Sequence, residues 1–253
     1  MNQTDNRRIY AIGDVHGCID QMRRVESEIL EDLKARPHAN PLIVFVGDYT
    51  DRGPDSRGTV EYLMRMQNTG PETLFLFGNH DLCFLDYLID PFAKTSRLHW
   101  LNSRMGGDMT LASYGVAGAS EFAPERTHQA FVDAVPDSHI AFLKNLPTTC
   151  RIGSYLFVHA GIRPGIALEQ QALMDLIWIR EGFLDSRADF GFSVVHGHTV
   201  VQQVEHAGNR IGIDTGAVFG GQLSCLVLED ARQDLLIGSA LKPLVAPRGY
   251  RQA

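Results

Sequence analysis

Five short apolar runs that each end in a polar cluster constrain the fold of this chain more than any other feature. The runs occupy residues 9–12, 42–46, 73–77, 155–158 and 192–195. Their length and apolar content are typical of buried β-strands. A helix with one apolar face is predicted between the first two runs, from the spacing of Met22, Val25, Ile29 and Leu33. The first unit is therefore strand, helix, strand.

Such alternation favours an α/β fold with parallel strands and helical crossovers, in which functional groups gather at the carboxyl ends of the strands. A second helix is predicted over residues 59–66, and further strands over 210–213, 223–228 and 235–237. The C-terminal strands are short and closely spaced, which suggests antiparallel additions. Residues 92–146 are mostly helical and rich in loops. We interpret them as a cover inserted into a single domain that spans residues 1–253.

Candidate metal ligands follow all five strands: Asp14, His16, Asp48, Asn79, His80, His159, His196 and His198. Each one alone is weak support for a metal site, because a buried histidine is more often a satisfied core residue. Together they would be costly to bury unless something compensates them, and a metal cluster does so. Mixed carboxylate, carboxamide and imidazole ligands suit manganese, iron or zinc. Two such ions can polarise a phosphoryl group and convert a bridging water to hydroxide, which predicts hydrolysis of phosphoesters.

Composition excludes several other classes of protein. The formal net charge of −7 gives no support for binding a nucleic-acid polymer. The four cysteines lie far apart and form no C-x-x-C pair, so neither a zinc knuckle nor a disulfide framework is indicated. No run of about 18 apolar residues occurs, and the polar N-terminus lacks the apolar core of a signal peptide. These features predict a cytoplasmic protein with no membrane partner.

Five sequence blocks resemble a known family. They are GDVHG (residues 13–17), GDYTDRG (47–53), GNHD (78–81), HAG (159–161) and GHT (197–199). The chain resembles the calcineurin-like metallophosphoesterases, and in particular the phosphoprotein phosphatase branch that includes bacterial serine/threonine phosphatases and diadenosine tetraphosphate hydrolases. The resemblance spans about residues 10–228. It implies a sandwich of two mixed β-sheets flanked by helices.

The resemblance also implies a dinuclear metal centre, with manganese favoured and iron or zinc as alternatives. Asp14 and His16 would hold the first ion and Asp48 would bridge both. The second ion would be held by Asn79, His159 and His198. The last metal histidine of the family is followed by threonine, which selects His198 and leaves His196 as a core residue or an outer contact of the centre.

Catalytic and phosphate-binding roles follow from the same resemblance. His80 would be a general acid partnered by Asp51, whose carboxylate would favour an imidazolium that protonates the leaving alkoxide. Alternatively, Asp51 only forms a salt bridge with Arg52. Arg52 and Arg180 would grip the substrate phosphate. The alternative for Arg180 is a surface arginine whose neighbour Trp178 fills the core.

The substrate is left open between two classes. A serine/threonine protein phosphatase acting on a phosphorylated protein or peptide is the leading hypothesis, supported by the GDYTDRG block and residues 178–180 and 214–217. The rival is a symmetrical dinucleoside tetraphosphate hydrolase, favoured by Asp81 where eukaryotic phosphatases of this branch carry glutamate, and by Val218. Residues 92–146 offer Trp100 and Tyr114 but no dense basic cluster to hold a polyphosphate, which mildly favours peptides. A non-catalytic binding module is the distant alternative.

Overall fold

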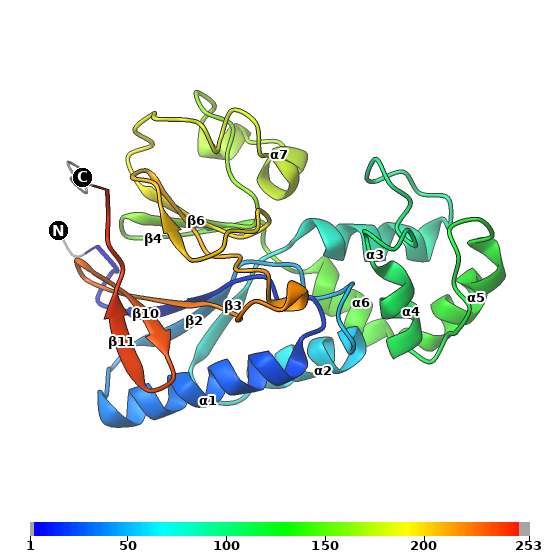
Figure 1. The fold of residues 1–253 in the computed structure, drawn as a ribbon, viewed down its shortest axis with the longest axis horizontal. Helices are drawn as coiled ribbons and strands as arrows, with labels where there is room; N and C mark the ends of the chain where they lie inside the picture. Colours follow the sequence, from blue (N-terminus) through cyan, green and yellow to red (C-terminus); the bar gives the residue numbers. More distant parts are fainter. Residues whose placement is uncertain (1–2, 248–253) are drawn as a thin grey trace.

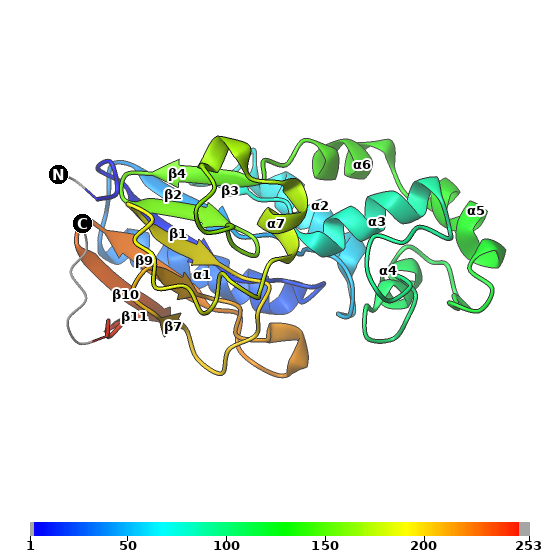
Figure 2. The same ribbon diagram turned by 90° about the horizontal axis from the view of Figure 1, so that it is seen from above.

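Two mixed β-sheets packed face to face form the centre of the computed structural model, which describes residues 3–247 (Figures 1 and 2). The predicted domain boundaries include residues 1–2 and 248–253, which lie outside the described residues. The first sheet has the order β11-β10-β9-β1-β2-β3 and the second has the order β4-β5-β6-β8-β7. The implied sandwich of two mixed sheets is confirmed.

The bounds of the strands agree closely with the five apolar runs. The first sheet contains β1 (Arg8–Ile12), β2 (Pro41–Phe45), β3 (Glu72–Phe75), β9 (Cys225–Glu229), β10 (Arg232–Ile237) and β11 (Ala240–Pro243). The second contains β4 (Thr149–Ile152), β5 (Tyr155–Val158), β6 (Ser193–His196), β7 (Glu205–His206) and β8 (Arg210–Gly212). Strands β4, β7 and β11 have no counterpart among the strands predicted from the sequence.

Strand direction in the second sheet differs from the expectation. In the first sheet β1, β2 and β3 run parallel and β9 and β10 pair antiparallel, as predicted, and the unpredicted β11 pairs antiparallel with β10. In the second sheet β5 pairs parallel with β6, and β6 with β8, so the predicted antiparallel additions are wrong there. The reason is that residues 159–192 separate β5 from β6, which is long enough for a crossover connection.

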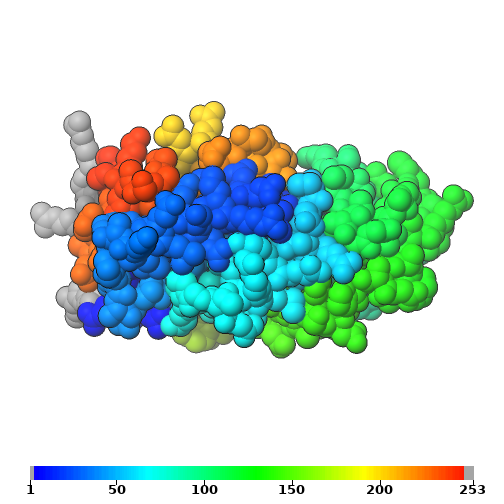
Figure 3. Space-filling view, turned by 90° about the horizontal axis from the view of Figure 1, so that it is seen from below, coloured from blue at the N-terminus to red at the C-terminus, as the bar shows by residue number. Residues whose placement is uncertain are grey.

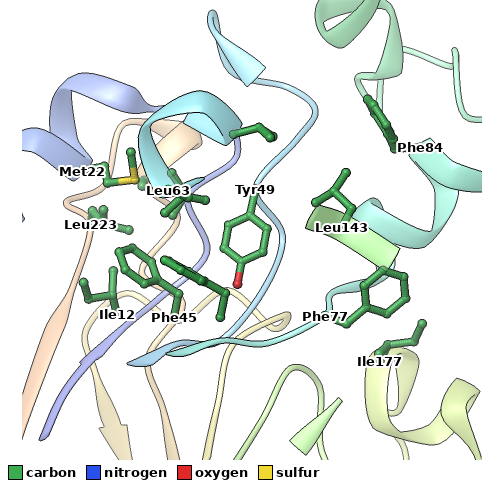
Figure 4. Close-up of a cluster of buried hydrophobic side chains, with 14 of the residues drawn as sticks. Ile12, Met22, Phe45, Tyr49, Leu63, Phe77, Phe84, Leu143, Ile177 and Leu223 are labelled. Carbon is green, nitrogen blue, oxygen red and sulfur yellow. The ribbon is translucent and has the colours of Figure 1, made fainter. Parts of the chain in front are cut away.

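Helices α1 (Ile19–Ala35) and α2 (Ser56–Met66) cover the outer face of the first sheet (Figures 1 and 3). The predicted apolar stripe of α1 is buried at Met22, Val25 and Ile29. The side chain of Asp55 caps α2 by accepting a hydrogen bond from the Gly58 N–H at 2.7 Å. Figure 4 shows Ile12, Phe45 and Tyr49 lying in the same buried cluster as Met22 and Leu63.

A second buried cluster fills the space between the two sheets. It contains Ile9 and Val44 from the first sheet and Phe157, Val195 and Ile211 from the second. Successive residues of a strand point to opposite faces, so β1 directs Tyr10 to the helices and Ile9 to the second sheet. This two-sided burial fixes the positions where the strands end. Within residues 3–247, none of the helices combines the length and apolar character needed to cross a membrane.

Four helices gather at one end of the molecule: α3 (Asn79–Ile89), α4 (Gly107–Ser113), α5 (Glu125–Ala134) and α6 (Asp137–Lys144) (Figures 1 and 2). The last three lie in residues 92–146, called the cover segment below. Helix α7 (Leu173–Trp178) belongs to the connection between β5 and β6, and short 3₁₀ turns occupy Leu168–Gln170 and Ala217–Phe219. The sequence suggested Trp100 and Tyr114 of the cover segment as stacking surfaces for a ligand. Each is only 4% exposed, so both are core residues.

Candidate metal centre

Polar residues that follow β1, β2, β3, β5 and β6 meet between the carboxyl ends of the two sheets. Two groups of side chains have ligand atoms that all lie within 4.8 Å of one another. The first contains His16, Asp48 and His80, and the second contains Asp48, His159 and His198. Asp48 belongs to both groups, which is the position that a bridging carboxylate requires.

The two remaining predicted ligands are Asp14 and Asn79. Asn79 Oδ1 lies 2.8 Å from His159 Nε2 and therefore joins the second group. Asp14 Oδ2 accepts a hydrogen bond from the His198 N–H at 2.9 Å, which ties the loop after β1 to the loop after β6. The first ion was expected to have Asp14, His16 and Asp48 as ligands. The first observed group instead contains His80 together with His16 and Asp48.

The tautomers of two histidines are determined by their backbone partners. His16 Nδ1 lies 2.8 Å from the Thr50 carbonyl oxygen, and His159 Nδ1 lies 2.9 Å from that of Val46. A carbonyl oxygen only accepts, so each Nδ1 carries a hydrogen and each Nε2 is directed into the centre. Such a bond to the outer ring nitrogen is the usual way in which proteins orient a metal-binding histidine.

The centre favours a cation between its acceptor atoms. His159 Nε2 lies 2.8 Å from Asn79 Oδ1 and 3.3 Å from Asp48 Oδ2, close to the roughly 3 Å that separates two ligands about 2.1 Å from one ion. Burial lowers the pKa of His159, but the Asp48 carboxylate outweighs burial and raises that pKa to about 9. The His159 imidazole next to it holds the pKa of Asp48 well below its usual value despite burial.

Several buried polar atoms of the centre have no hydrogen-bond partner within the described residues: Asp14 Oδ1, Asn79 Nδ2 and His198 Nε2. Burial raises the pKa of the Asp14 carboxyl well above its usual value, and the nearby Asp214 adds to this effect. Asn79 Nδ2 is a donor, whereas Asp14 Oδ1 and His198 Nε2 can accept, and an unpaired buried acceptor costs free energy unless a ligand compensates it. The residues present therefore fit a site for divalent cations.

Backbone conformation brings these side chains close together. Positive φ angles, in the left-handed region of backbone conformation, occur at His16, Asp48, Asp51, Arg52 and His198. Such conformations cost free energy and persist where the surrounding contacts require them. A Cβ atom at Gly78 or Gly197 would collide with the carboxylates of Asp48 and Asp14 respectively, so only glycine permits these approaches.

The expected pair of His80 and Asp51 is present. His80 Nδ1 lies 2.6 Å from Asp51 Oδ2, and no ion pair joins Asp51 to Arg52 among the described residues. Burial lowers the pKa of His80 to about 3 and raises that of Asp51 to about 7, an effect that opposes the expected imidazolium. The physical reason is that both groups are fully enclosed, while Arg52 faces the other ring nitrogen of His80.

Both predicted phosphate-binding arginines lie at the centre. Arg52 Nη1 lies 2.6 Å from His16 Nε2, and its Nη2 lies 2.8 Å from His80 Nε2. Arg180 Nη2 donates to the His198 carbonyl oxygen at 3.2 Å. Burial lowers the pKa of Arg180, partly offset by the charge of Asp48. The guanidinium of Arg180 therefore lies beside the candidate ligand His198, while the residue as a whole is exposed.

Some functional contacts were missed or misinterpreted from the sequence. Both carboxylate oxygens of Asp81 accept backbone hydrogen bonds, from the N–H groups of Asp48, Tyr49 and Gly78 at 3.0 to 3.1 Å. Asp81 therefore joins two loops of the centre through backbone hydrogen bonds. His196 faces away from both ligand groups, with its ring packed 5.2 Å from that of Phe183.

Two residues of the cover segment also contact the site without any signal in the local sequence. Trp100 Nε1 and Thr110 Oγ1 each donate to the Asp51 carboxylate at 2.7 Å. They lie 49 and 59 residues from Asp51 along the chain. No motif spans such a distance, so only the folded chain reveals these contacts.

Comparison with known proteins agrees with this geometry. The chain is 28% identical over 223 residues to the serine/threonine-protein phosphatase 1 of Salmonella typhimurium, covering 86% of this chain and 90% of that one. It is 31% identical over 157 residues to the symmetrical bis(5'-nucleosyl)-tetraphosphatase of Methylococcus capsulatus, covering 62% and 44% respectively. A crystal structure of a cold-active protein tyrosine phosphatase has the same fold, with a TM-score of 0.65, 17% identity, and 95% and 81% of the two chains covered.

The family model described as calcineurin-like phosphoesterase matches residues 7–218, most of the chain and all five sequence blocks. This family uses divalent metals, in agreement with the two groups of candidate ligands. The relatives named above belong to its phosphoprotein phosphatase branch. The chain therefore belongs to the calcineurin-like phosphoesterase family and is a phosphoric-ester hydrolase.

Proposed function

We propose that this hydrolase is a serine/threonine protein phosphatase that uses two divalent metal ions, with manganese favoured over iron or zinc. The observation that carries the proposal is one buried cluster of candidate ligands with two arginines and a histidine beside it. Oxygen and imidazole ligands suit manganese, although iron and zinc accept the same donors. The four cysteines are free, which fits the reducing cytoplasm.

The proposed ligands of the two ions are Asp14, His16, Asp48, Asn79, His159 and His198. When bound, the ions would supply polarisation of the phosphoryl group and activation of water. The protein contributes fixed positions, because His16 and His159 are oriented by backbone carbonyls and Asp48 accepts a hydrogen bond from the His80 N–H at 2.9 Å. Ligands held in this way lose little entropy when the centre forms.

The remaining residues of the site would act on the substrate itself. Arg52 presents two nitrogens side by side, which matches two oxygens of a phosphate, and Arg180 adds positive charge at the same centre. In the structure His80 Nε2 faces the donating Arg52 guanidinium, so His80 would take up a proton on Nε2 only after the substrate phosphate engages Arg52. His80 would then give this proton to the leaving oxygen as the P–O bond breaks, and Asp51 would hold its Nδ1–H. A phosphate dianion between the arginines would offset the effect of burial and favour the imidazolium that this step needs.

The choice of a phosphoprotein over a dinucleotide rests on the cover segment and on one relative. The aromatic residues Trp100 and Tyr114 of that segment are buried and cannot stack on a nucleobase. The Salmonella typhimurium protein phosphatase aligns over nearly its whole length. One observation favours the dinucleotide: Phe219 is 64% exposed, and its ring lies 5.4 Å from the guanidinium carbon of Arg52, where it could stack on a base.

A comparison of substrates under one metal loading tests the proposal. Chelated protein should be inactive on all phosphoesters and regain activity with added Mn²⁺, and kcat/KM should then be higher for a phosphothreonine peptide than for diadenosine tetraphosphate. Phe219→Ala should leave KM for the peptide within about twofold, because a peptide needs little contact beyond the phosphate. A clear advantage for the dinucleotide, together with a raised KM for it in Phe219→Ala, would replace the protein-phosphatase assignment with the dinucleotide one.

A further inference from the structure

The carboxylate of Asp51 is held by three donors, and two of them come from the cover segment. Trp100 Nε1 donates to Oδ2 at 2.7 Å and Thr110 Oγ1 donates to Oδ1 at 2.7 Å, while His80 Nδ1 contacts Oδ2 at 2.6 Å. All four residues are at most 4% exposed. Hydrogen bonds to a charged group in such an enclosed place are among the stronger ones in proteins.

The cover segment also holds the backbone on which Asp51 and Arg52 lie. These two consecutive residues adopt φ values of 75° and 66°, a conformation that costs free energy outside glycine. The Asp51 N–H donates to Thr110 Oγ1 at 2.9 Å, and the Arg52 N–H donates to the Gly106 carbonyl oxygen at 3.0 Å. The cover segment therefore stabilises the strained turn that carries both side chains.

Rigid packing fixes the donor atoms themselves. The Trp100 ring packs against Tyr87, Phe84 and Phe131, with ring centroids 4.8, 5.9 and 5.8 Å away. Thr110 Oγ1 lies 3.0 Å from Ser56 Oγ, so its hydroxyl is held from a second side. A side chain locked by packing can orient a catalytic group without reorganising during the reaction.

We propose that the cover segment is part of the catalytic apparatus, in which Trp100 and Thr110 are positioning residues that hold the Asp51 carboxylate against His80. This inference rests on the proposed acid role of His80. As the P–O bond breaks, the leaving oxygen takes the Nε2 proton of His80, and the imidazole becomes neutral with its Nδ1–H still bonded to Asp51. Without its other two donors the carboxylate can rotate away from His80, so proton donation is impaired while phosphate binding is retained.

Two variants that remove the donor atoms, Trp100→Phe and the isosteric Thr110→Val, test the proposal on the metal-loaded full chain. Each should lower kcat for a phosphothreonine peptide by about 10-fold, the lower end of the effect of removing an outer hydrogen bond at an active site. KM should change by less than about twofold, and kcat for p-nitrophenyl phosphate by less than about threefold, because its acidic leaving group needs little protonation. Metal content and the melting temperature are measured alongside.

Matched controls separate positioning from packing. Tyr87→Phe removes a buried hydroxyl that donates to the Pro124 carbonyl oxygen at 2.9 Å, in the same aromatic cluster as Trp100. Thr59→Val removes a buried hydroxyl that has no hydrogen-bond partner within the described residues. Both controls should leave the ratio of the two kcat values unchanged.

The pattern of losses decides between the outcomes, with His80→Asn as the reference for a lost acid. If His80→Asn slows the peptide far more than the nitrophenyl ester while Trp100→Phe and Thr110→Val behave like the controls, the positioning role is overturned and the acid assignment stands. Equal losses on both substrates in the two cover variants would overturn the positioning role as well. If His80→Asn itself slows both substrates equally, the proposed acid role fails and this inference fails with it.

Discussion

Strand β1 connects two buried polar clusters that differ in how completely they are satisfied. At its first residue, Arg8 donates to Glu229 at 2.9 Å and lies 3.7 Å from Asp32, and Tyr10 donates to the same Asp32 at 2.6 Å. Arg36 also pairs with Asp32. None of these side chains has a buried polar atom without a partner in the described part of the chain. We call this set the amino-end cluster.

The metal centre begins with Asp14, two residues after the carboxyl end of β1. In contrast to the amino-end cluster, it contains buried polar atoms without a hydrogen-bond partner within the described structure. Asp14 Oδ1, Asn79 Nδ2 and His198 Nε2 have no partner among residues 3–247, and positive φ values are frequent in its loops. Both clusters include buried residues of the first sheet, but Glu229 and Arg36 of the amino-end cluster are partly exposed, with 26% and 33% of their side chains accessible. Complete pairing marks the amino-end cluster as a stabilising feature, whereas incomplete pairing and strain mark the other as a site that a ligand completes.

The largest effect is expected from Asp48→Asn in the metal centre. We predict that turnover falls by roughly 1,000-fold or more, beyond the 10- to 100-fold typical for outer contacts of a metal ligand. The amide oxygen can still accept the His80 N–H that Asp48 Oδ1 accepts at 2.9 Å, so the fold should be retained. Metal stoichiometry and kcat are the measurements, and near-normal values for both would remove the bridging role of Asp48.

The amino-end cluster should show the reverse behaviour in Arg8→Met. Loss of the guanidinium leaves Asp32 and Glu229 without their shared partner, so the free energy of unfolding should fall by about 3 kcal/mol while kcat and metal content stay unchanged. The free energy of unfolding is measured by urea denaturation. Arg7→Met is the matched control, because Arg7 pairs with Glu72 on the exposed surface and such pairs contribute about 1 kcal/mol or less. A loss of activity at normal stability would contradict the division of roles.

Divalent metal should stabilise the protein through the unpaired acceptor atoms of the centre, Asp14 Oδ1 and His198 Nε2. At a free Mn²⁺ concentration 100 times Kd the stabilisation is about 2.7 kcal/mol. For a chain of this size that corresponds to a rise in melting temperature of roughly 5 to 10 °C over chelated protein. Asp48→Asn should lose most of this rise and Arg8→Met should keep it. An equal metal-induced rise in melting temperature for Asp48→Asn and Arg8→Met would contradict the difference between the two clusters.

The smallest effect concerns the two arginines of the clusters. Arg8 pairs with carboxylates, whereas Arg52 forms no ion pair with a carboxylate in the described structure. Arg52→Lys keeps the charge but loses the paired nitrogens, so KM and the inhibition constant of free phosphate should rise by about 10-fold. Arg57→Lys, on a surface pair with Glu61, should change neither. Unchanged inhibition by phosphate would show that Arg52 does not grip the substrate.

Much of the fold could be predicted because strand burial leaves a strong local signal. The apolar runs at 9–12, 42–46 and 155–158 mark β1, β2 and β5 to within one residue. Helix α3 was not predicted, because it is apolar on nearly all sides and carries no helical periodicity. The edge strands β4, β7 and β11 are short and partly polar, so their pairing with a neighbouring strand defines them more than their sequence does.

The predicted metal ligands were also within reach of the sequence, since each lies a few residues after a strand and parallel strands place their ends together, whereas Arg180 follows helix α7. The contacts between pairs of these residues could not be predicted from the sequence. The structure places His80 beside His16 and Asp48, and it gives Asp81 a purely internal set of partners. Both results depend on side-chain orientation, which motif spacing does not specify.

The sequence by itself determined the identity and order of the chemical groups, because glycine, aspartate and histidine at strand ends reflect local backbone and ligand chemistry. Only the tertiary structure decided which groups lack partners, which charges face one another, and that Trp100 and Thr110 reach Asp51 from a distant segment. The physical reason is that burial and hydrogen bonding depend on surroundings assembled from the whole chain. Trp100 and Thr110 are separated from Asp51 by 49 and 59 positions, and they meet it only after the cover segment packs against the rest of the fold.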